Sequence, residues 1–317
     1  MGLLDSGIPM LNGTLSHPDL DDQNKIIIGR DFVETLPADT TVRDLLGHGT
    51  HVAGIAGAET NNNTGIAGIA WNCKILVVQA FDAGGYSIPQ AFYNAVRYTV
   101  DYARNNNYKL VINFSGGWNT AAGPLQDAVA YANSHNVVIV ASAGNNYGGY
   151  VRWPAAYSSS YQNVIAVSAT DQDDDVSSYS NIGPQIDVSA PGGRGGYRDG
   201  SVWKFNGANN LGRNILSTEP NYSFNLQAGM DCTEDYGYLA GTSMAAPHVS
   251  GTVALMLSVD PSLSPSQIKS ILRYTADKVT SMGRNDWTSE YGYGRVNTYK
   301  ALKFHFGTLT ASETWSG

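Results

Sequence analysis

Short apolar runs alternate along the chain with stretches whose apolar residues recur at helical spacing. Five runs are nearly continuous in apolar character and predict strands covered on both faces: Leu3–Leu4, Lys74–Gln79, Leu110–Phe114, Val137–Ala141 and Val164–Ser168. Helices are predicted between and after them, over Gly47–Gly57, Ile88–Asn105, Pro124–His135 and Ser243–Leu257. This alternation is typical of βαβ units, and it predicts an α/β protein with a mostly parallel sheet in a three-layer α/β/α arrangement.

Three further segments complete this outline. A late helix is predicted to begin after Ser264, because Ser is a good N-cap, Pro265 suits the first turn and Gln267 holds the capping-box position. The segments Gly192–Asn214 and Glu219–Leu239 are rich in Gly, Asn, Tyr and Asp and show neither period. We therefore predict two long surface loops, of a kind that often carries function.

Composition narrows the class of protein. With 42% hydrophobic and 15% charged residues the chain is too apolar to be disordered, and no apolar run is long enough to span a bilayer. The net charge of −8 and the absence of a Lys/Arg cluster argue against a nucleic-acid partner. Two cysteines, Cys73 and Cys232, cannot form a disulfide scaffold, and we expect free thiols.

Three short motifs together contain the residue types that one kind of reaction needs. An acid ends the first predicted strand, a His begins a helix lined with Gly and Ala, and a Ser stands at the mouth of another helix, where backbone N–H groups are free to donate. The motifs are Leu3-Leu4-Asp5-Ser6-Gly7, Gly47-His48-Gly49-Thr50-His51-Val52-Ala53-Gly54 and Gly241-Thr242-Ser243-Met244-Ala245-Ala246-Pro247-His248. Nucleophilic acyl transfer needs an acid, a base and a hydroxyl of this kind.

Each motif alone has a simpler interpretation. Asp-Ser-Gly is a common turn, and Gly-Thr-Ser is a common N-cap. His48 and His51 could instead hold a metal in a metal-dependent amidase, although no Glu lies between them and no third ligand is evident. A peptide-binding module without turnover is a further alternative, because only four residues precede Asp5 in its strand and that strand is expected to fray.

Together, in this order, the motifs resemble those of the subtilisin-like serine proteases, the subtilase family, and the resemblance covers nearly the whole chain. It implies a subtilisin-like fold over residues 1–306, with 307–317 as a tail that begins a further module. It also implies serine endopeptidase activity, with Ser243 as nucleophile, His48 as general base and acid, and Asp5 orienting the imidazole. Asn145, in Ala143-Gly144-Asn145-Asn146, resembles the family's oxyanion donor.

The resemblance also indicates where substrate would bind. Ser115, Gly116 and Gly117 follow a predicted strand and resemble the segment that lines the primary pocket and pairs with an extended polypeptide. Gly116 replaces a larger apolar residue, so we expect a more open pocket wall. Gly84 would form the other flank. Arg152 falls near the pocket base, where it would shorten the pocket or recruit an acidic side chain.

Calcium is the cofactor that the resemblance implies. The loop from Thr60 to Ile66 resembles the family's metal loop, and Asp19 would add a carboxylate to its oxygens. The expected ligands are Asp19, Thr60, Asn62, Thr64 and Ile66. The resemblance further implies a pro-segment that assists folding and a secreted or cell-surface location, with the signal peptide outside this chain.

Overall fold

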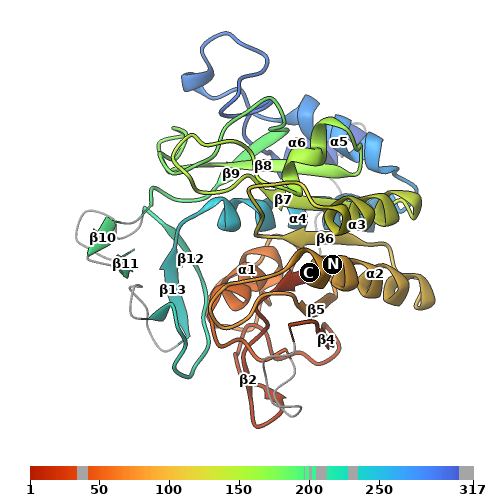
Figure 1. Ribbon diagram of the computed structural model, residues 1–317, viewed down its shortest axis with the longest axis vertical. Coiled ribbons are helices and arrows are strands. Elements are labelled where there is room, and N and C mark those ends of the chain that lie inside the picture. Colours follow the sequence, from red (N-terminus) through yellow and green to blue (C-terminus); the bar gives the residue numbers. More distant parts are fainter. Residues whose placement is uncertain (34–41, 196, 200–201, 205–212, 228–234, 307–317) are drawn as a thin grey trace.

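The computed structural model describes residues 1–33, 42–195, 197–199, 202–204, 213–227 and 235–306. At its centre lies a seven-stranded sheet with the strand order β4-β5-β1-β6-β7-β8-β9 (Figure 1). Every neighbouring pair in this sheet is parallel. Its strands are β1 (Gly2–Asp5), β4 (Ile26–Asp31), β5 (Ile75–Gln79), β6 (Val111–Phe114), β7 (Val138–Ser142), β8 (Val164–Thr170) and β9 (Val188–Pro191).

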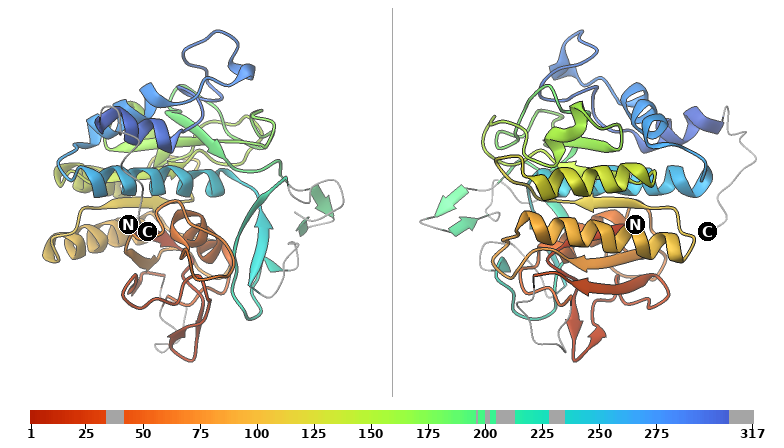
Figure 2. Two further views of the ribbon diagram at one scale, coloured as in Figure 1. Left: turned by 180° about the vertical axis from the view of Figure 1, so that it is seen from behind. Right: turned by 45° about the vertical axis from the view of Figure 1, so that its right-hand side comes forward.

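Helices cover both faces of the sheet. One face packs on α2 (Pro89–Asn105) and α3 (Gly123–Ser134), and the other on α1 (His48–Gly57) and α4 (Thr242–Val259). Successive strand residues serve the two faces in turn, so Ile112 packs toward α2 while its neighbour Val111 lies in the cluster that contains α4. Figure 2 shows α4 in front of the sheet on the left, and α2 and α3 in front on the right. The predicted three-layer α/β/α fold is confirmed.

Strand β1 sits inside the sheet between β5 and β6. Gly2, Leu3 and Leu4 have partners on both sides, and Asp5 pairs with Gln79. All four residues are buried. The expectation of a frayed first strand was therefore wrong: two neighbouring strands and two helical layers hold these four residues in place.

The two segments that were predicted to be long loops contain short strands. Residues Tyr236–Leu239 form a strand, β13, which pairs antiparallel with β12 (Ile215–Thr218). The first segment contains a small hairpin of β10 (Tyr197–Asp199) and β11 (Val202–Lys204). Four or fewer residues per strand give too short a pattern to recognise against a Gly- and Tyr-rich background. Neither segment is the wholly irregular loop that we expected.

The remaining elements are a β2–β3 hairpin near the amino terminus and a carboxyl-terminal group of helices. They comprise β2 (Met10–Leu11), β3 (Thr14–Leu15), the 3₁₀ helices η2 (Ala155–Ser159) and η4 (Thr280–Met282), α5 (Pro265–Thr275) and α6 (Thr298–Phe306). The predicted capping box of Ser264 and Gln267 at the start of α5 is confirmed. The expected tail 307–317 lies outside the described residues.

Two smaller expectations can be placed in this fold. Cys73 is half-buried with a free thiol, whereas Cys232 lies outside the described residues. None of the helices in the described part of the chain has the length and apolar character that crossing a membrane requires.

Candidate active site

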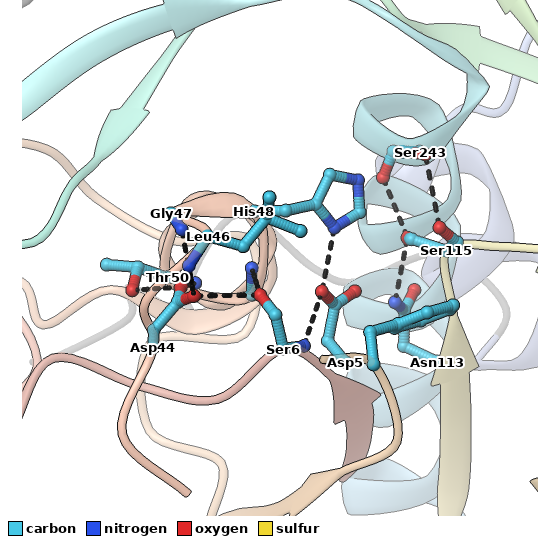
Figure 3. Close-up of polar contacts among 12 residues, drawn as sticks. Asp5, Ser6, Asp44, Leu46, Gly47, His48, Thr50, Asn113, Ser115 and Ser243 are labelled. Carbon is cyan, nitrogen blue, oxygen red and sulfur yellow. Dashed lines mark hydrogen bonds and ion pairs between the residues drawn. The ribbon is translucent and has the colours of Figure 1, made fainter. Parts of the chain in front are cut away.

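The carboxylate of Asp5 and the imidazole of His48 meet at the carboxyl end of the central strand. Asp5 ends β1 and His48 begins α1, and Nδ1 of His48 lies 2.7 Å from Oδ1 of Asp5 (Figure 3). The backbone N–H of Ser6 donates to the same carboxylate oxygen over 2.8 Å. Because Nδ1 keeps its proton and donates it in a hydrogen bond to the carboxylate, Nε2 of the imidazole is free to accept another proton.

The environment of His48 favours its protonated form. Burial on its own would lower the pKa of His48, but the charge of Asp5 and its hydrogen bond, together with the charge of Asp44, outweigh that effect. The pKa of His48 is therefore raised above its ordinary value. The imidazole is thus a stronger base than a free histidine.

Asp44 holds the start of helix α1, a role that the sequence analysis missed. Its Oδ1 accepts from the hydroxyl of Ser6 and from the backbone N–H groups of Leu46 and Gly47. Its Oδ2 accepts from both the backbone and the hydroxyl of Thr50. The N-cap position itself is Gly47, but an acidic residue shortly before a predicted helix can accept from the free N–H groups of its first turn, and this signal could have revealed the role.

Ser243 lies in the first turn of α4, next to the end of β6. Its hydroxyl donates to the backbone carbonyl of Ser115 over 3.2 Å, and the Ser115 hydroxyl donates to the backbone carbonyl of Ser243 over 2.8 Å. Figure 3 shows the imidazole of His48 between Asp5 and Ser243. The hydrogen bonds among the described residues include none from Ser243 to His48, so the hydroxyl must turn from Ser115 toward the imidazole before it can react.

The carboxamide of Asn145 is fixed by Thr242. Its Oδ1 accepts from the backbone N–H and from the hydroxyl of Thr242, each over 2.9 Å. The Thr242 hydroxyl in turn accepts from the backbone N–H of Gly144. Because its oxygen is engaged in this way, Asn145 is left with its NH₂ group as a donor.

A cavity of about 240 Å³ joins these groups to the predicted pocket residues. Its lining comprises Leu46, His48, Phe81, Gly85, Ser115, Gly116, Gly117, Ser142, Gly144, Asn145, Arg152, Thr242 and Ser243. The structure thus brings the predicted Ser115, Gly116, Gly117 and Arg152 to the reactive groups. It does not place Gly84 in this lining, where its neighbour Gly85 lies instead.

Phe81 occupies the space beside Gly116. A Cβ atom on Gly116 would lie only 2.3 Å from the Phe81 ring, which also stacks on Phe114. The expectation that Gly116 opens the pocket wall was therefore wrong, because an aromatic ring from another segment fills the space that the missing side chain leaves.

Arg152 lies across one end of the cavity. Its stem packs on Gly144, where a Cβ atom would meet Cγ and Cδ of Arg152 at 2.9 Å. Its Nε donates to Oδ1 of Asn146 over 2.9 Å, and its Nη1 donates to the Gly117 carbonyl over 3.4 Å. These contacts fix a cation at the cavity that also contains Ser243.

His51 is buried, and its hydrogen bonds go to backbone carbonyl groups. Its Nε2 donates to the backbone carbonyls of Ile215 and Gly237, which ties α1 to the β12–β13 hairpin. Burial and the nearby charge of His48 lower the pKa of His51 to about 3, so the ring is neutral. In the described part of the chain no group of three His, Cys, Asp or Glu side chains could hold a metal. The structure therefore gives no support to the amidase alternative.

The predicted calcium loop folds around the buried carboxylate of Asp19. Oδ1 of Asp19 accepts from the side-chain amide of Asn62 over 2.7 Å, and Oδ2 accepts from the backbone N–H of Ile66 over 2.9 Å. The hydroxyl of Tyr236 also donates to Oδ2. Thr60 Oγ1 is buried without a hydrogen-bond partner. Both oxygens of this carboxylate therefore accept hydrogen bonds from N–H and O–H groups, whereas Thr60 Oγ1 is an acceptor without a partner, of the kind that a hard cation takes as a ligand.

Thr64 completes the expected ligand set. Its backbone N–H donates to the side-chain oxygen of Asn62 within the same loop, over 3.4 Å. The five residues expected as ligands therefore lie in one compact loop and on the buried Asp19 that the loop encloses.

Comparison with known proteins adds independent findings. A family model described as the subtilase family matches residues 1–294. The chain is 38% identical over 304 residues to the thermophilic serine proteinase of Bacillus sp. (strain AK1), covering 96% of this chain and 61% of that protein. It is 37% identical over 304 residues to thermitase of Thermoactinomyces vulgaris, covering 96% of this chain and 88% of that protein.

A solved structure shows the same similarity. Fervidolysin from Fervidobacterium pennivorans, described as a keratinolytic enzyme related to subtilisin, matches with a TM-score of 0.71 and 32% identity. The match covers 95% of this chain and 42% of that one. The chain thus spans less than two thirds of the length of fervidolysin and of the Bacillus proteinase.

Proposed function

The chain belongs to the subtilase family, whose members are serine endopeptidases acting on polypeptides, and from that premise we propose that it hydrolyses peptide bonds through an acyl-enzyme on Ser243. The observation that carries the proposal is the 2.7 Å contact between Asp5 and His48 beside a cavity that Ser243 and Asn145 also line. The base and the hydroxyl then line one binding space, and a buried acid supports the base from behind.

The proposed mechanism follows from the proton chemistry of these groups. The Ser243 oxygen attacks the peptide carbonyl while Nε2 of His48 takes its proton, and Asp5 stabilises the resulting imidazolium. Asn145 donates its NH₂ group, and Ser243 its backbone N–H, to the oxyanion. His48 then protonates the leaving amine, and a water activated by His48 hydrolyses the ester by the reverse sequence.

The alternative function, a peptide-binding module without catalysis, is not supported. It rested on an incomplete first strand, whereas β1 is paired on both sides and holds Asp5 at 1% exposure. The Bacillus relative is named as a serine proteinase and fervidolysin as a keratinolytic enzyme.

The proposed substrate is an extended polypeptide that runs along the end of β6. Ser115, Gly116 and Gly117 follow the last residue of this strand and line the cavity beside Ser243, where their backbone would pair with an extended peptide. The residue on the acyl side of the scissile bond would enter the 240 Å³ cavity. Arg152 would then favour an acidic side chain at that position by charge pairing.

The proposal includes a structural calcium ion. Asp19 and the loop oxygens of Thr60, Asn62, Thr64 and Ile66 would hold it, where it would neutralise a buried carboxylate and brace the loop. We also propose that a pro-segment assists folding and that the protein is secreted or lies at the cell surface. Family membership alone supports these two points.

Active-site labelling tests the central proposal. The chain and its Ser243→Ala variant are treated with a fluorophosphonate probe and weighed intact, with circular dichroism as a control of folding. We expect one adduct on the unaltered chain and none on the variant. A folded chain that gains no adduct, or a variant that still does, would contradict an acyl-enzyme on Ser243.

A further inference from the structure

Asn181 is a buried side chain that the proposed reaction does not use. It lies in the segment between β8 and β9, only 1% of its surface is exposed, and it stands outside the lining of the catalytic cavity. Its carboxamide binds the loop 143–150, which carries Asn145 and leads into Arg152. The contacts of this one side chain therefore bear on two groups of the active site.

The carboxamide of Asn181 ties both ends of the loop to its middle. Nδ2 donates to the carbonyl of Tyr150 over 2.8 Å and to the carbonyl of Ala143 over 3.2 Å, while Oδ1 accepts from the backbone N–H of Asn146 over 2.7 Å. A primary amide has two N–H donors and an acceptor oxygen, and all of them are engaged by the loop. An aspartate or a leucine of the same shape could not make the same three contacts.

The backbone around Asn181 holds the same loop. The N–H of Asn181 donates to the Gly144 carbonyl over 2.9 Å, and the N–H of Ile182 donates to the Gly149 carbonyl over 3.1 Å. A Cβ atom on Gly144 would lie only 2.5 Å from Nδ2 of Asn181, at a backbone φ of +105° that favours glycine. The side chain of Asn181 is therefore packed inside the loop, and Gly144 makes room for it.

Two functional groups depend on the shape of this loop. The side chain of Asn146, whose backbone Asn181 holds, accepts from Nε of Arg152 over 2.9 Å. The backbone N–H of Arg152 donates to the carbonyl of Ala143, which Asn181 also binds. Asn145, the proposed oxyanion donor, lies between two residues whose backbone Asn181 binds. Asn181 thus binds the supports of both groups.

We propose that Asn181 is a positioning residue that sets the spacing between the oxyanion donor of Asn145 and the cation of Arg152. The inference rests on the proposed function. In an acidic substrate residue, the carbonyl oxygen would bind at Asn145 and the carboxylate at Arg152. Both groups belong to one residue, so its fit depends on the distance between their two partners. Asn181 would then govern the rate of acylation and the preference for acidic side chains together.

Two peptides that differ only by Glu or Gln before the scissile bond measure both effects. We expect the unaltered chain to prefer Glu at least tenfold in kcat/KM. Asn181→Ala should reduce this ratio to about two and lower kcat for the Gln peptide about tenfold. Asn146→Ala should lower the ratio severalfold, with a smaller loss of kcat, because it removes only the acceptor for Arg152. The double variant should show the ratio of Asn181→Ala alone, since both changes act on one cation.

Asn163→Ala is the matched control. Asn163 is also fully buried, and its Nδ2 donates to two backbone carbonyls, those of Val129 and Val137. It directly precedes β8, at the end of the sheet opposite to the carboxyl ends that border the active site. We expect Asn163→Ala to lower the melting temperature about as much as Asn181→Ala does, and to leave both kcat and the Glu-to-Gln ratio unchanged.

Labelling with the fluorophosphonate probe separates the possible failures. An unaltered chain that gains no adduct contradicts the proposed function, and the inference falls with it. An active chain that cleaves both peptides equally, an Asn181→Ala variant that keeps the preference for Glu, or an Asn163→Ala variant that loses it to the same extent overturns the inference alone. Where Asn181→Ala does not fold, Asn146→Ala decides, because its side chain is exposed, and an unchanged ratio there overturns the inference.

Discussion

The Ser115 hydroxyl donates to the backbone carbonyl of Ser243 over 2.8 Å, at a position where a helical hydrogen bond is missing. Pro247 lies four residues beyond Ser243 inside α4 and has no N–H to offer that carbonyl. The proline therefore frees an acceptor on Ser243, and the end of β6 binds it. The Ser115 hydroxyl is itself held by the Asn113 side chain, whose oxygen accepts from Ser250 on α4.

This contact predicts that Ser115→Ala impairs catalysis more than stability. The carbonyl of Ser243 would lose its partner, at a cost of about 1 kcal/mol in the free energy of unfolding. The first turn of α4 would be less firmly placed against β6, so we expect about a tenfold loss of kcat with little change in KM. Steady-state hydrolysis of a fluorogenic peptide measures both. The control Ser258→Ala, an exposed position of α4, should be neutral, and an equally neutral Ser115→Ala would contradict the positioning role.

Thr242 is expected to affect catalysis by orienting the side chain of Asn145. Thr242→Val removes the hydroxyl that donates to Asn145 Oδ1, so the carboxamide would be less firmly oriented, and we expect kcat to fall about tenfold. Asn145→Ala should cost about 10² to 10³ in kcat, a magnitude taken from subtilisin itself rather than derived from this geometry. In the double variant the two losses should not add, since both act on one donor. Additive losses would show that Thr242 acts by another route.

The loss of activity at acidic pH should follow the protonation of His48. The imidazole must be neutral to accept a proton, so activity is lost as the pH falls through its pKa. Because this pKa is raised, we expect half-maximal kcat/KM on the acid side above pH 6.5. Asp5→Asn removes the charge that opposes burial, so the midpoint should move to lower pH while kcat falls about 10⁴-fold. A midpoint below pH 6.5 in the unaltered chain would contradict the assigned environment.

The sequence alone was sufficient where chemistry and position coincide in a short segment. Asp5, His48 and Ser243 each stand at the end of a predictable strand or the start of a predictable helix, and their grouping in one site was expected from the resemblance of their motifs to those of the subtilase family. Strands β4 and β9 were not predicted: β4 lies at an edge of the sheet and carries Gly29 and Arg30, and β9 has only four residues.

The supporting contacts were not predictable because they join distant segments. The ring of Phe81 fills the space at Gly116, and Thr242 orients Asn145 from almost a hundred positions away. A pattern in one segment carries no information on such partners. Asp44 is the exception, since it lies shortly before the helix that His48 begins.

Calcium binding is expected to stabilise the chain through Asp19. A ligand present at a hundred times its dissociation constant adds about 2.7 kcal/mol to the free energy of unfolding, so chelation should lower the melting temperature by several degrees. Asp19→Asn should abolish this response to chelator, whereas Asp82→Asn, at an exposed turn, should keep it. Calorimetry with calcium and with excess chelator measures the difference. Equal melting temperatures in the two conditions would contradict a calcium site.

Arg152 is expected to make the acyl-side pocket selective for acidic side chains. Its Nε and Nη1 are engaged by Asn146 and Gly117, while Nη2 makes no hydrogen bond among the described residues and can bind a carboxylate. A charge-assisted hydrogen bond of this kind contributes about 1.5 to 3 kcal/mol, so peptides with Glu before the scissile bond should be cleaved at least tenfold better than their Gln counterparts.

Variants of Arg152 distinguish the effect of its charge on selectivity from the effect of its size on the pocket. Arg152→Ala should remove the preference for Glu over Gln, and it should also admit larger side chains, because the stem that packs on Gly144 shortens the cavity. Arg152→Lys keeps the charge without the two-armed geometry and should retain part of the preference. The measurement is kcat/KM over a peptide series that varies only at this position, with Arg104→Ala as the control. A preference for large aromatic residues in the unaltered chain would contradict both the charge and the shortened pocket.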